Sequence, residues 1–421
     1  MNRVKSMSII WVVLAVVITL YYLVLRQHVF KVEETRGEVV VAIILLVGIV
    51  GSLLLALVIR VVTIFTHRSS NVVPSLLWGT LFAGMLLTLM VVLSQMTAYT
   101  PEIQGVRPIA ELKKIDINGR TEWLSIRGED RTKPVMLFLA GGPGGSHLAT
   151  ARHYFKSLES SYVVVIWEQP GASKSLGAID PADITLDTYL DDGAEVVNYL
   201  RNEFKQSKIF LMGESWGSAL GLMMVEQHPE FYYSFIGTGQ MVDFLETEII
   251  DYQMALDDAR KNGNDGLVAK LEEQGPPPYS SGVALKTIAY LSPLNGIMAR
   301  TGQLNSAPVS TLDGYLGVEY GLLDKLNYFW GLFRTLDVFY SKLYSVDLRE
   351  RCLSLDVPIY VFHGRYDFNA PASLVEDYMQ RLKAPAKSLV YFEHSGHNPW
   401  QTENELFIQR ARAVFEETMK E

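Results

Sequence analysis

Three polar residues of the 421-residue chain have the types and the chain order of a serine-based hydrolytic site. Ser215 lies in GESWG (213–217), the only G-x-S-x-G of the sequence. Asp367 follows in HGRYDFNAP, and His397 follows in EHSGHNPW. A serine hydroxyl becomes a nucleophile when an imidazole removes its proton and a carboxylate orients that imidazole. These residues therefore predict nucleophilic catalysis through an acyl-enzyme.

The base and the acid each have an alternative. His394 lies three residues before His397, nearer to the end of the preceding apolar run. His397 lies in a Ser-Gly-His turn, which leaves an imidazole free to reach inward, so the sequence favours His397 as the base. His363 lies too close to the acid in the chain. Asp367 itself can instead cap the helix that follows its loop.

Acyl transfer also requires backbone donors for the oxyanion. One expected donor is the N–H group of Trp216, which follows the nucleophile. The other should lie in the segment AGGPGGSH (140–147), with Gly142 as first choice and Gly141 as second. A phosphate-binding loop is the alternative for these glycines, but no Lys-Ser/Thr pair follows them. We expect no metal site, because no metal-ligand spacing such as H-E-x-x-H occurs.

The elements that must position these residues follow residue 100. An Asn118-Gly119 pair predicts a hairpin. Short apolar runs then predict strands buried on both faces of a parallel sheet, and helix-like segments at 186–204 and 218–231 alternate with them. The strand-like runs are 134–140, 162–168, 208–212, 358–362 and 388–392. The expected fold is therefore a doubly wound α/β structure, in which strand, tight turn and helix surround Ser215.

Three uncharged apolar runs precede this pattern, at 8–25, 39–59 and 75–96. Each has about 18 or more residues, enough to cross a ~30 Å hydrocarbon core as a helix. A cleavable signal peptide explains only the first run. We therefore expect three transmembrane helices and a multi-pass location in the cell membrane. Basic residues divide almost evenly between the two sides, so the side of the catalytic region stays open.

Composition and length restrict the remaining possibilities. The net charge of −9 argues against a nucleic-acid partner. A single cysteine, Cys352, excludes an internal disulfide framework and a multi-cysteine metal site. The apolar and α/β patterns predict a membrane region (1–100), a first core part (101–240), a helical cap (241–345) and a second core part (346–421). The oligomeric state is not readable.

Five segments together resemble the proline iminopeptidase branch of the α/β-hydrolase superfamily. They are LFLAGGPGG, WEQPGASKS, GESWGS, HGRYDFNAP and SGHNPW. The resemblance implies an α/β-hydrolase fold with a helical cap, a triad of Ser215, Asp367 and His397, and no cofactor. It also implies removal of an N-terminal residue, typically proline, from short peptides. Acidic cap residues hold the free amine in this family, and the candidates here are Asp243, Glu246 and Glu248.

The chain departs from the family pattern at four positions around the site. Ala140 stands where a His precedes Gly-Gly-Pro, Glu168 and Pro170 replace the Asp and Arg of a DQRG-type loop, and Glu214 replaces the usual Gly before the nucleophile. The three apolar runs are not part of the soluble members. These departures leave the substrate class open.

Three functions follow, in order of preference. The first is a membrane-anchored serine hydrolase of aminopeptidase type, acting on small peptides or amides beside a lipid bilayer. The second is a carboxylesterase or lipase-like hydrolase of acyl esters, because the aromatic stretch 315–344 can line an acyl pocket. The third is an inactive membrane receptor or scaffold, which the complete set of Ser215, Asp367 and His397 disfavours.

Overall fold

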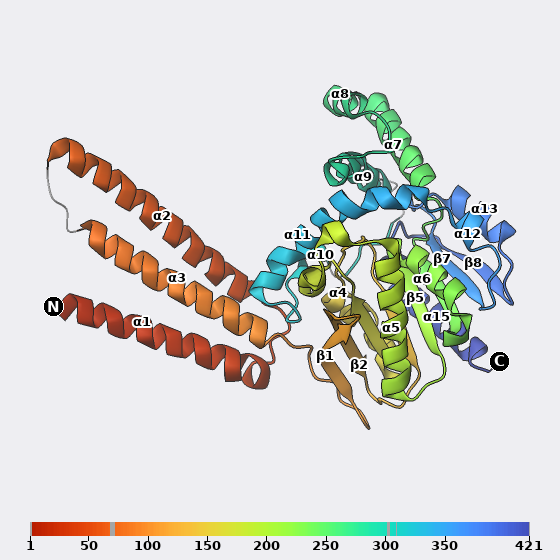
Figure 1. The fold of residues 1–421 in the computed structure, drawn as a ribbon, viewed down its shortest axis with the longest axis horizontal. Helices are drawn as coiled ribbons and strands as arrows, with labels where there is room; N and C mark the ends of the chain where they lie inside the picture. Colours follow the sequence, from red (N-terminus) through yellow and green to blue (C-terminus); the bar gives the residue numbers. More distant parts are fainter. Residues whose placement is uncertain (1, 68–71, 301–303, 309, 421) are drawn as a thin grey trace. The chain divides into compact units, whose positions relative to one another are not determined.

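The computed structural model describes residues 2–67, 72–300, 304–308 and 310–420 (Figure 1). Parts of the predicted membrane region and cap (1, 68–71, 301–303 and 309) and residue 421 lie outside the described residues. The chain divides into two compact units. The first contains Met1–Pro101 and Tyr315–Lys325, and the second contains Glu102–Gly314 and Leu326–Glu421. A short segment of the predicted cap therefore clusters with the N-terminal region.

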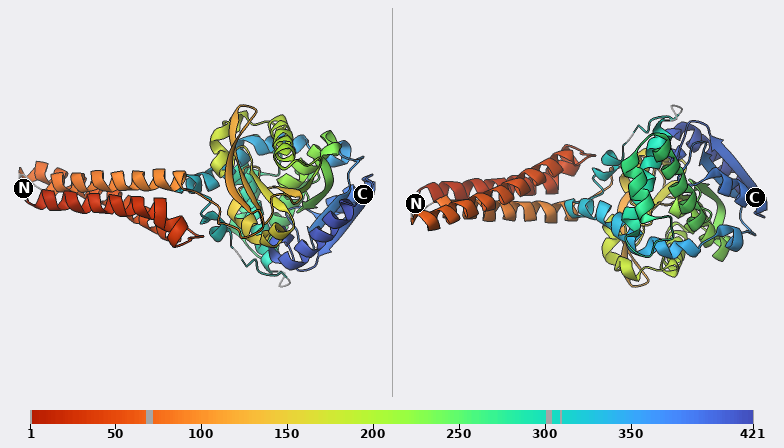
Figure 2. Two further views of the ribbon diagram at one scale, coloured as in Figure 1. Left: turned by 90° about the horizontal axis from the view of Figure 1, so that it is seen from below. Right: turned by 90° about the horizontal axis from the view of Figure 1, so that it is seen from above.

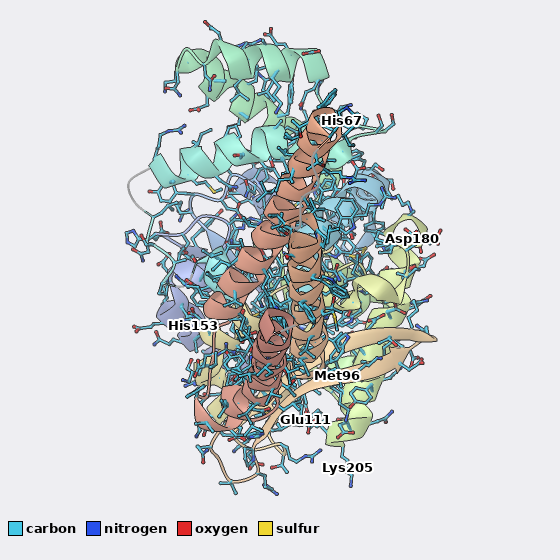
Figure 3. All side chains as sticks on the ribbon, turned by 90° about the vertical axis from the view of Figure 1, so that its left-hand side faces the viewer. His67, Met96, Glu111, His153, Asp180 and Lys205 are labelled. Atoms are coloured by element: carbon cyan, nitrogen blue, oxygen red, sulfur yellow. The ribbon has the colours of Figure 1, made fainter. Side chains whose placement is uncertain are left out.

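Long apolar helices form the first unit, drawn in red to orange in Figure 1. They are α1 (Asn2–Leu20), which continues as the π-helix η1 (Tyr21–Val29), α2 (Arg36–Thr66) and α3 (Val72–Met96). Within the described residues, three helical segments (Ile9–Val29, α2 and α3) are long and apolar enough to cross a membrane. His67 and Met96, labelled in Figure 3, mark the C-terminal ends of α2 and α3.

Most apolar side chains of these helices remain exposed, such as Val47 at 65% and Leu57 at 60%. A helix bundle in water would bury such side chains, whereas hydrocarbon can surround them. The helices nevertheless contact one another through specific side chains. The Trp11 ring of α1 stacks on Phe82 of α3 with centroids 5.7 Å apart. The three helices therefore have the surface expected of candidate membrane spans.

Buried polar groups gather where η1 ends and α2 begins. The guanidinium of Arg26 is fully buried, and its Nε lies 2.8 Å from Glu38 Oε1. The segment 315–325 belongs to the same unit, and the backbone N–H of Thr35 donates to Leu316 O at 2.8 Å. A charge in an apolar environment is tolerated when a partner compensates it. These pairs therefore let polar groups occupy the interior of the first unit.

Among the described residues of the second unit, eight strands form one sheet in the order β1-β2-β4-β3-β5-β6-β7-β8. β1 pairs antiparallel with β2 and β2 antiparallel with β4, while the other neighbours are parallel. Asn118 and Gly119 turn the β1–β2 hairpin with φ of 51° and 77°, as their sequence predicts. The strands are β1 (Ile109–Ile117), β2 (Arg120–Gly128), β3 (Val135–Leu139), β4 (Val163–Glu168), β5 (Ile209–Glu214), β6 (Tyr232–Thr238), β7 (Ile359–Gly364) and β8 (Lys387–Phe392).

Helices cover both faces of this sheet (Figure 2). On one face, Leu211 belongs to the same apolar core as α5 (Leu186–Phe204) and α6 (Trp216–Gln227). On the other face, Phe210 stacks on Phe415 of α15 with centroids 4.3 Å apart. Successive side chains of a strand point to opposite faces, so burial on both faces requires a continuous apolar run. The remaining core helices are α4 (Leu148–Tyr154), α12 (Leu348–Arg351), α13 (Ala372–Arg381), α14 (Pro399–Thr402) and α15 (Asn404–Thr418), with 3-10 turns η2 (Lys156–Ser160), η3 (Ser173–Ala178), η4 (Pro181–Asp183), η5 (Pro229–Phe231) and η6 (Tyr340–Ser345).

The predicted runs match every parallel strand except β6, which they miss. Its sequence YYSFIGT contains Ser234, Gly237 and Thr238, so no continuous apolar run marks it. Ser234 and Thr238 are nevertheless fully buried. β6 is buried because it lies between β5 and β7 in the sheet, which its composition does not predict.

Between β6 and β7 the chain forms a helical insertion. Asp243 begins it as the N-cap of α7 by accepting the backbone N–H of Glu246 at 2.8 Å. The described residues of this stretch contain helices and no strand of the sheet. The helices are α7 (Phe244–Lys261), α8 (Asp265–Gln274), α9 (Val283–Arg300), α10 (Thr311–Tyr315) and α11 (Leu322–Phe339).

Candidate active site

Ser215 lies at the tight turn between β5 and α6. Its backbone has φ 54° and ψ −123°, a conformation that non-glycine residues rarely adopt and that is found at functional turns. A Cβ at Gly213 would lie 2.2 Å from Gly217 O, and one at Gly217 would lie 2.2 Å from Leu139 O. Both glycines are therefore required by close backbone approach. The turn presents Ser215 at the carboxyl end of a central strand.

Asp367 and His397 are in direct contact, although 30 residues separate them. Asp367 follows β7 and His397 follows β8, two neighbouring parallel strands. His397 Nδ1 lies 2.9 Å from Asp367 Oδ2 and 3.0 Å from Oδ1. Asp367 Oδ1 also accepts the backbone N–H groups of Asn369 and Ala370, both at 3.0 Å. The carboxylate is therefore held in place from its own loop while it orients the imidazole.

The contact between Asp367 and His397 shifts the pKa values of both residues. Burial alone raises the pKa of Asp367, but the charge and hydrogen bond of His397 outweigh burial and leave the pKa below its usual value. Burial lowers the pKa of His397, but the carboxylates of Asp367 and, to a smaller degree, Glu214 raise it to about 9. The imidazole is thus strongly stabilised in its protonated form, which a general base needs after it accepts a proton.

A cavity of about 320 Å³ is lined by three of the five predicted site residues, while Asp367 and Trp216 are not part of its described lining. Ser215 and His397 both line it, as does Gly142 of the glycine-rich segment. The cap contributes the rest of its wall, mainly from α11. The described lining residues are Gly141, Gly142, Gly145, Ser146, His147, Glu214, Ser215, Met241, Glu248, Thr287, Leu291, Thr311, Tyr328, Phe329, Leu332, Leu336, Tyr340, Asn369 and His397. In the part of the chain that the structure describes, no group of His, Cys, Asp or Glu side chains is placed to hold a metal ion.

The two alternative histidines, His394 and His363, are not among the described residues that line the cavity. The backbone N–H of His394 donates to Glu403 Oε2 at 2.8 Å, and His394 is not part of the cavity lining. His363 is fully buried behind the acid, with its Nδ1 3.9 Å from Asp367 Oδ2. Burial lowers the pKa of His363, which disfavours its charged form. The geometry favours His397 over both.

The glycine-rich segment after β3 folds tightly on itself. A Cβ at Gly142 would lie 2.5 Å from Gly145 N, and the backbone φ of Gly142 is +129°. The N–H of Gly141 donates to Glu214 Oε2 at 2.7 Å and is therefore already engaged. Trp216 begins α6, and its indole N–H donates to Gln169 Oε1 at 3.0 Å, which anchors the start of the helix.

Glu214, which stands where the family pattern has glycine, also lines the cavity, although its position in the sequence did not suggest a role there. Its side chain is buried, and Oε1 lies 3.9 Å from His397 Nε2 while Oε2 lies 3.6 Å from His147 Nε2. Burial alone raises the pKa of Glu214, but His147, His397 and the N–H of Gly141 outweigh burial and hold it below its usual value. The sequence could have indicated this position, because a charged residue directly before Ser215 must lie at the tight turn.

The three candidate cap acids have different positions. Asp243 and Glu246 both pair with Arg349, at 2.8 and 2.6 Å. Of these three described residues, Glu248 alone lines the cavity. Its carboxylate is buried and accepts hydrogen bonds from the hydroxyl groups of Tyr290, Tyr340 and Thr287. Burial raises the pKa of Glu248 to about 7.

Comparison with known proteins adds the family context. The model of the alpha/beta hydrolase fold family matches residues 134–271. The chain is 30% identical over 304 residues to the probable aminopeptidase YbaC of Bacillus subtilis, covering 72% of this chain and 95% of that protein. It is 24% identical over 297 residues to a proline iminopeptidase of Saccharolobus solfataricus, covering 68% and 84%. The crystal structure of a proline iminopeptidase from Mycobacterium smegmatis matches with a TM-score of 0.53 at 15% identity, covering 74% of this chain and 99% of that one.

Proposed function

Because the chain belongs to the α/β-hydrolase family, in its proline iminopeptidase-like branch, we propose that it is a serine aminopeptidase. It releases an N-terminal residue from short peptides or amides through an acyl-enzyme. The observation that carries this proposal is the cavity, which is lined both by Ser215 at its strained turn and by His397, itself hydrogen-bonded to Asp367.

The proposed reaction uses the chain's own groups. Ser215 Oγ attacks the scissile carbonyl carbon while His397 Nε2 takes the hydroxyl proton, and Asp367 stabilises the imidazolium. The N–H groups of Gly142 and Trp216 stabilise the oxyanion. Gly142 is preferred over Gly141, whose N–H is engaged by Glu214. His397 then donates its proton to the leaving amine, and water releases the acyl group by the same steps.

The charge of the cavity supports a substrate with a free amine. Among the described residues that line it, Glu214 and Glu248 are carboxylates, and none is lysine or arginine. The basic groups of the described lining are the imidazoles of His147 and His397, and a buried carboxylate with no lysine or arginine beside it favours a cationic ligand. The volume of about 320 Å³ lies at the small end of ligand sites, which span roughly 300–1,000 Å³. A single N-terminal residue suits this size.

One observation favours the ester hydrolase as the second candidate. The wall that α9 and α11 contribute is largely apolar, with Leu291, Leu332 and Leu336 beside Tyr328. Such a wall also accommodates a short acyl chain. Rates for a proline amide and for an uncharged acyl ester of similar size separate the two functions. An aminopeptidase prefers the amide with a free amine, whereas a carboxylesterase prefers the uncharged ester.

We propose further that the three apolar helices anchor the enzyme in a bilayer. Their length, composition and exposed apolar surface support this. The test is alkaline carbonate washing of membranes that contain the full-length chain. Integral helices keep the protein in the pellet, and release into the wash would contradict the anchor.

A further inference from the structure

We propose that Glu214 is a substrate-binding residue whose carboxylate accepts the α-ammonium group of the N-terminal residue beside Ser215. This inference rests on the proposed aminopeptidase function. It assigns amine recognition to the nucleophile turn itself, at a position where the family pattern has glycine, in addition to any acid on the cap.

The position of Glu214 matches the place where a substrate amine must lie. The carbonyl carbon under attack approaches Ser215 Oγ to about 3–3.5 Å. The α-nitrogen is two bonds from that carbon, so it lies only about 2.5 Å further on. Glu214 directly precedes Ser215 and lines the same cavity. Its carboxylate is therefore within reach of an ammonium held next to the reacting carbonyl.

The carboxylate of Glu214 is fixed but not saturated. Oε2 accepts the N–H of Gly141 at 2.7 Å, which locks the side chain against the glycine-rich segment. Oε1 faces His397 Nε2 at 3.9 Å, longer than a hydrogen bond. The imidazoles around it are those of His397 and of His147, whose Nε2 lies 3.6 Å from Oε2. An acceptor oxygen thus remains for a donor that enters the cavity.

Acyl transfer alone does not explain a carboxylate here. Negative charge beside the developing oxyanion opposes the tetrahedral intermediate, because both are held in a buried site of low dielectric. A substrate ammonium placed between them removes this repulsion. Glu214 therefore penalises substrates without an amine and favours substrates with one, which is how a specificity determinant acts.

Glu248 on the cap complements Glu214 but has different properties. Its oxygens already accept three hydroxyl groups, and burial raises its pKa to about 7, so it is only partly ionised at neutral pH. The pKa of Glu214 is instead lowered, mainly by His147 and His397, which favours its charged form. The ammonium of an N-terminal proline has two N–H groups. One carboxylate at the turn and one on the cap offer an acceptor for each.

The test compares Glu214→Gln with the wild type, as full-length protein in detergent, on two substrates of equal shape. Prolyl-4-nitroanilide carries the amine, and cyclopentanecarbonyl-4-nitroanilide replaces it with CH2. Glutamine keeps an oxygen for the Gly141 N–H but loses the charge. We expect kcat/KM for the prolyl substrate to fall about 10- to 100-fold, mostly through KM, and the uncharged substrate to be unchanged or faster.

Glu246→Gln is the matched control, since it removes an acidic group that pairs with Arg349 outside the cavity. It should leave the ratio of the two rates unchanged. Glu214→Gly supplies the family residue and tests the same ratio if the glutamine variant folds poorly. An equal fall on both substrates, or no fall on either, overturns the role of Glu214. If the wild type hydrolyses the prolyl substrate no faster than the uncharged one, the proposed aminopeptidase function itself is wrong. This outcome is separate from a failure of the role of Glu214.

Discussion

In the first unit, the buried guanidinium of Arg26 lies 2.8 Å from Glu38, and the buried Nζ of Lys325, whose pKa burial lowers to about 7, donates to two backbone carbonyls. In the second unit, Glu214 and Glu248 are buried in a cavity whose described lining contains no lysine or arginine. The cost of burying charge is large unless a partner compensates it. Charge paired with a fixed partner therefore has a structural role in the first unit, whereas the carboxylates of the cavity, which have no lysine or arginine beside them, remain accessible to a cationic ligand.

The largest expected effect is loss of the nucleophile or its base. Ser215→Ala and His397→Ala should each lower kcat by about 10⁴-fold or more, because triad members act as a unit. Ser215→Ala should also abolish labelling by a fluorophosphonate probe. His394→Ala, the matched control, should keep most of its turnover. A labelled Ser215→Ala protein, or an inactive His394→Ala beside an active His397→Ala, would contradict the assignment.

In the first unit, removal of one partner from a buried pair should cost stability and not chemistry. Glu38→Gln leaves Arg26 buried without its anion and should lower the free energy of unfolding by about 3–5 kcal/mol. Thermal unfolding in detergent measures this. Glu34→Gln is the control, because Glu34 forms an exposed pair with Arg36 and should change stability by less than about 1 kcal/mol. Equal effects of the two variants would contradict the contrast between buried and exposed pairs.

Removing the charge of Glu248 should raise stability, in contrast to Glu38→Gln, because no lysine or arginine lies beside the buried Glu248 carboxylate in the described cavity lining. Its pKa is raised to about 7 by burial, so the folded state binds a proton more tightly than the unfolded state. This contribution to stability is complete below the unfolded pKa and is lost as the pH rises towards 7. Glu248→Gln should therefore gain stability over the wild type, on the order of 3 kcal/mol, at pH 8 but not at pH 4.5. The test is to measure the unfolding midpoints of the variant and the wild type at both pH values. A difference that does not change with pH would contradict the raised pKa of Glu248.

The smallest expected effect concerns the charge of Glu214 on the base. With an uncharged ester, kcat/KM should rise with pH to a midpoint near 9, because His397 must lose its proton to act. Glu214 helps to hold that proton, so Glu214→Gln should lower the midpoint by up to about one unit. A rising midpoint in the variant would refute the coupling. The shift also separates the effect on His397 from amine binding, which requires a substrate amine.

Two turns of the second unit could be recognised from short local sequences. Gly213 and Gly217 flank Ser215 at the tight turn, and Asn118-Gly119 forms the hairpin, because backbone conformation depends strongly on the residues adjacent in the chain. Apolar runs predicted the buried strands for the same local reason, and β6 was missed where Ser234 interrupts the run. The family match confirms the fold that this pattern and the resemblance indicated.

Contacts between residues far apart in the chain decided which polar side chains are paired and which line the cavity. Asp243, Glu246 and Glu248 look alike in the sequence, yet Arg349, about a hundred residues later, pairs with the first two and leaves Glu248 to the cavity. Leu316 joins the first unit through Thr35, 281 residues away. Composition and turn chemistry act over a few residues, so the sequence by itself determined most of the helices and strands, the tight turn at Ser215 and the candidate membrane spans. Which carboxylates are paired and which are left for a ligand depends on contacts between distant segments, and only the tertiary structure determines those.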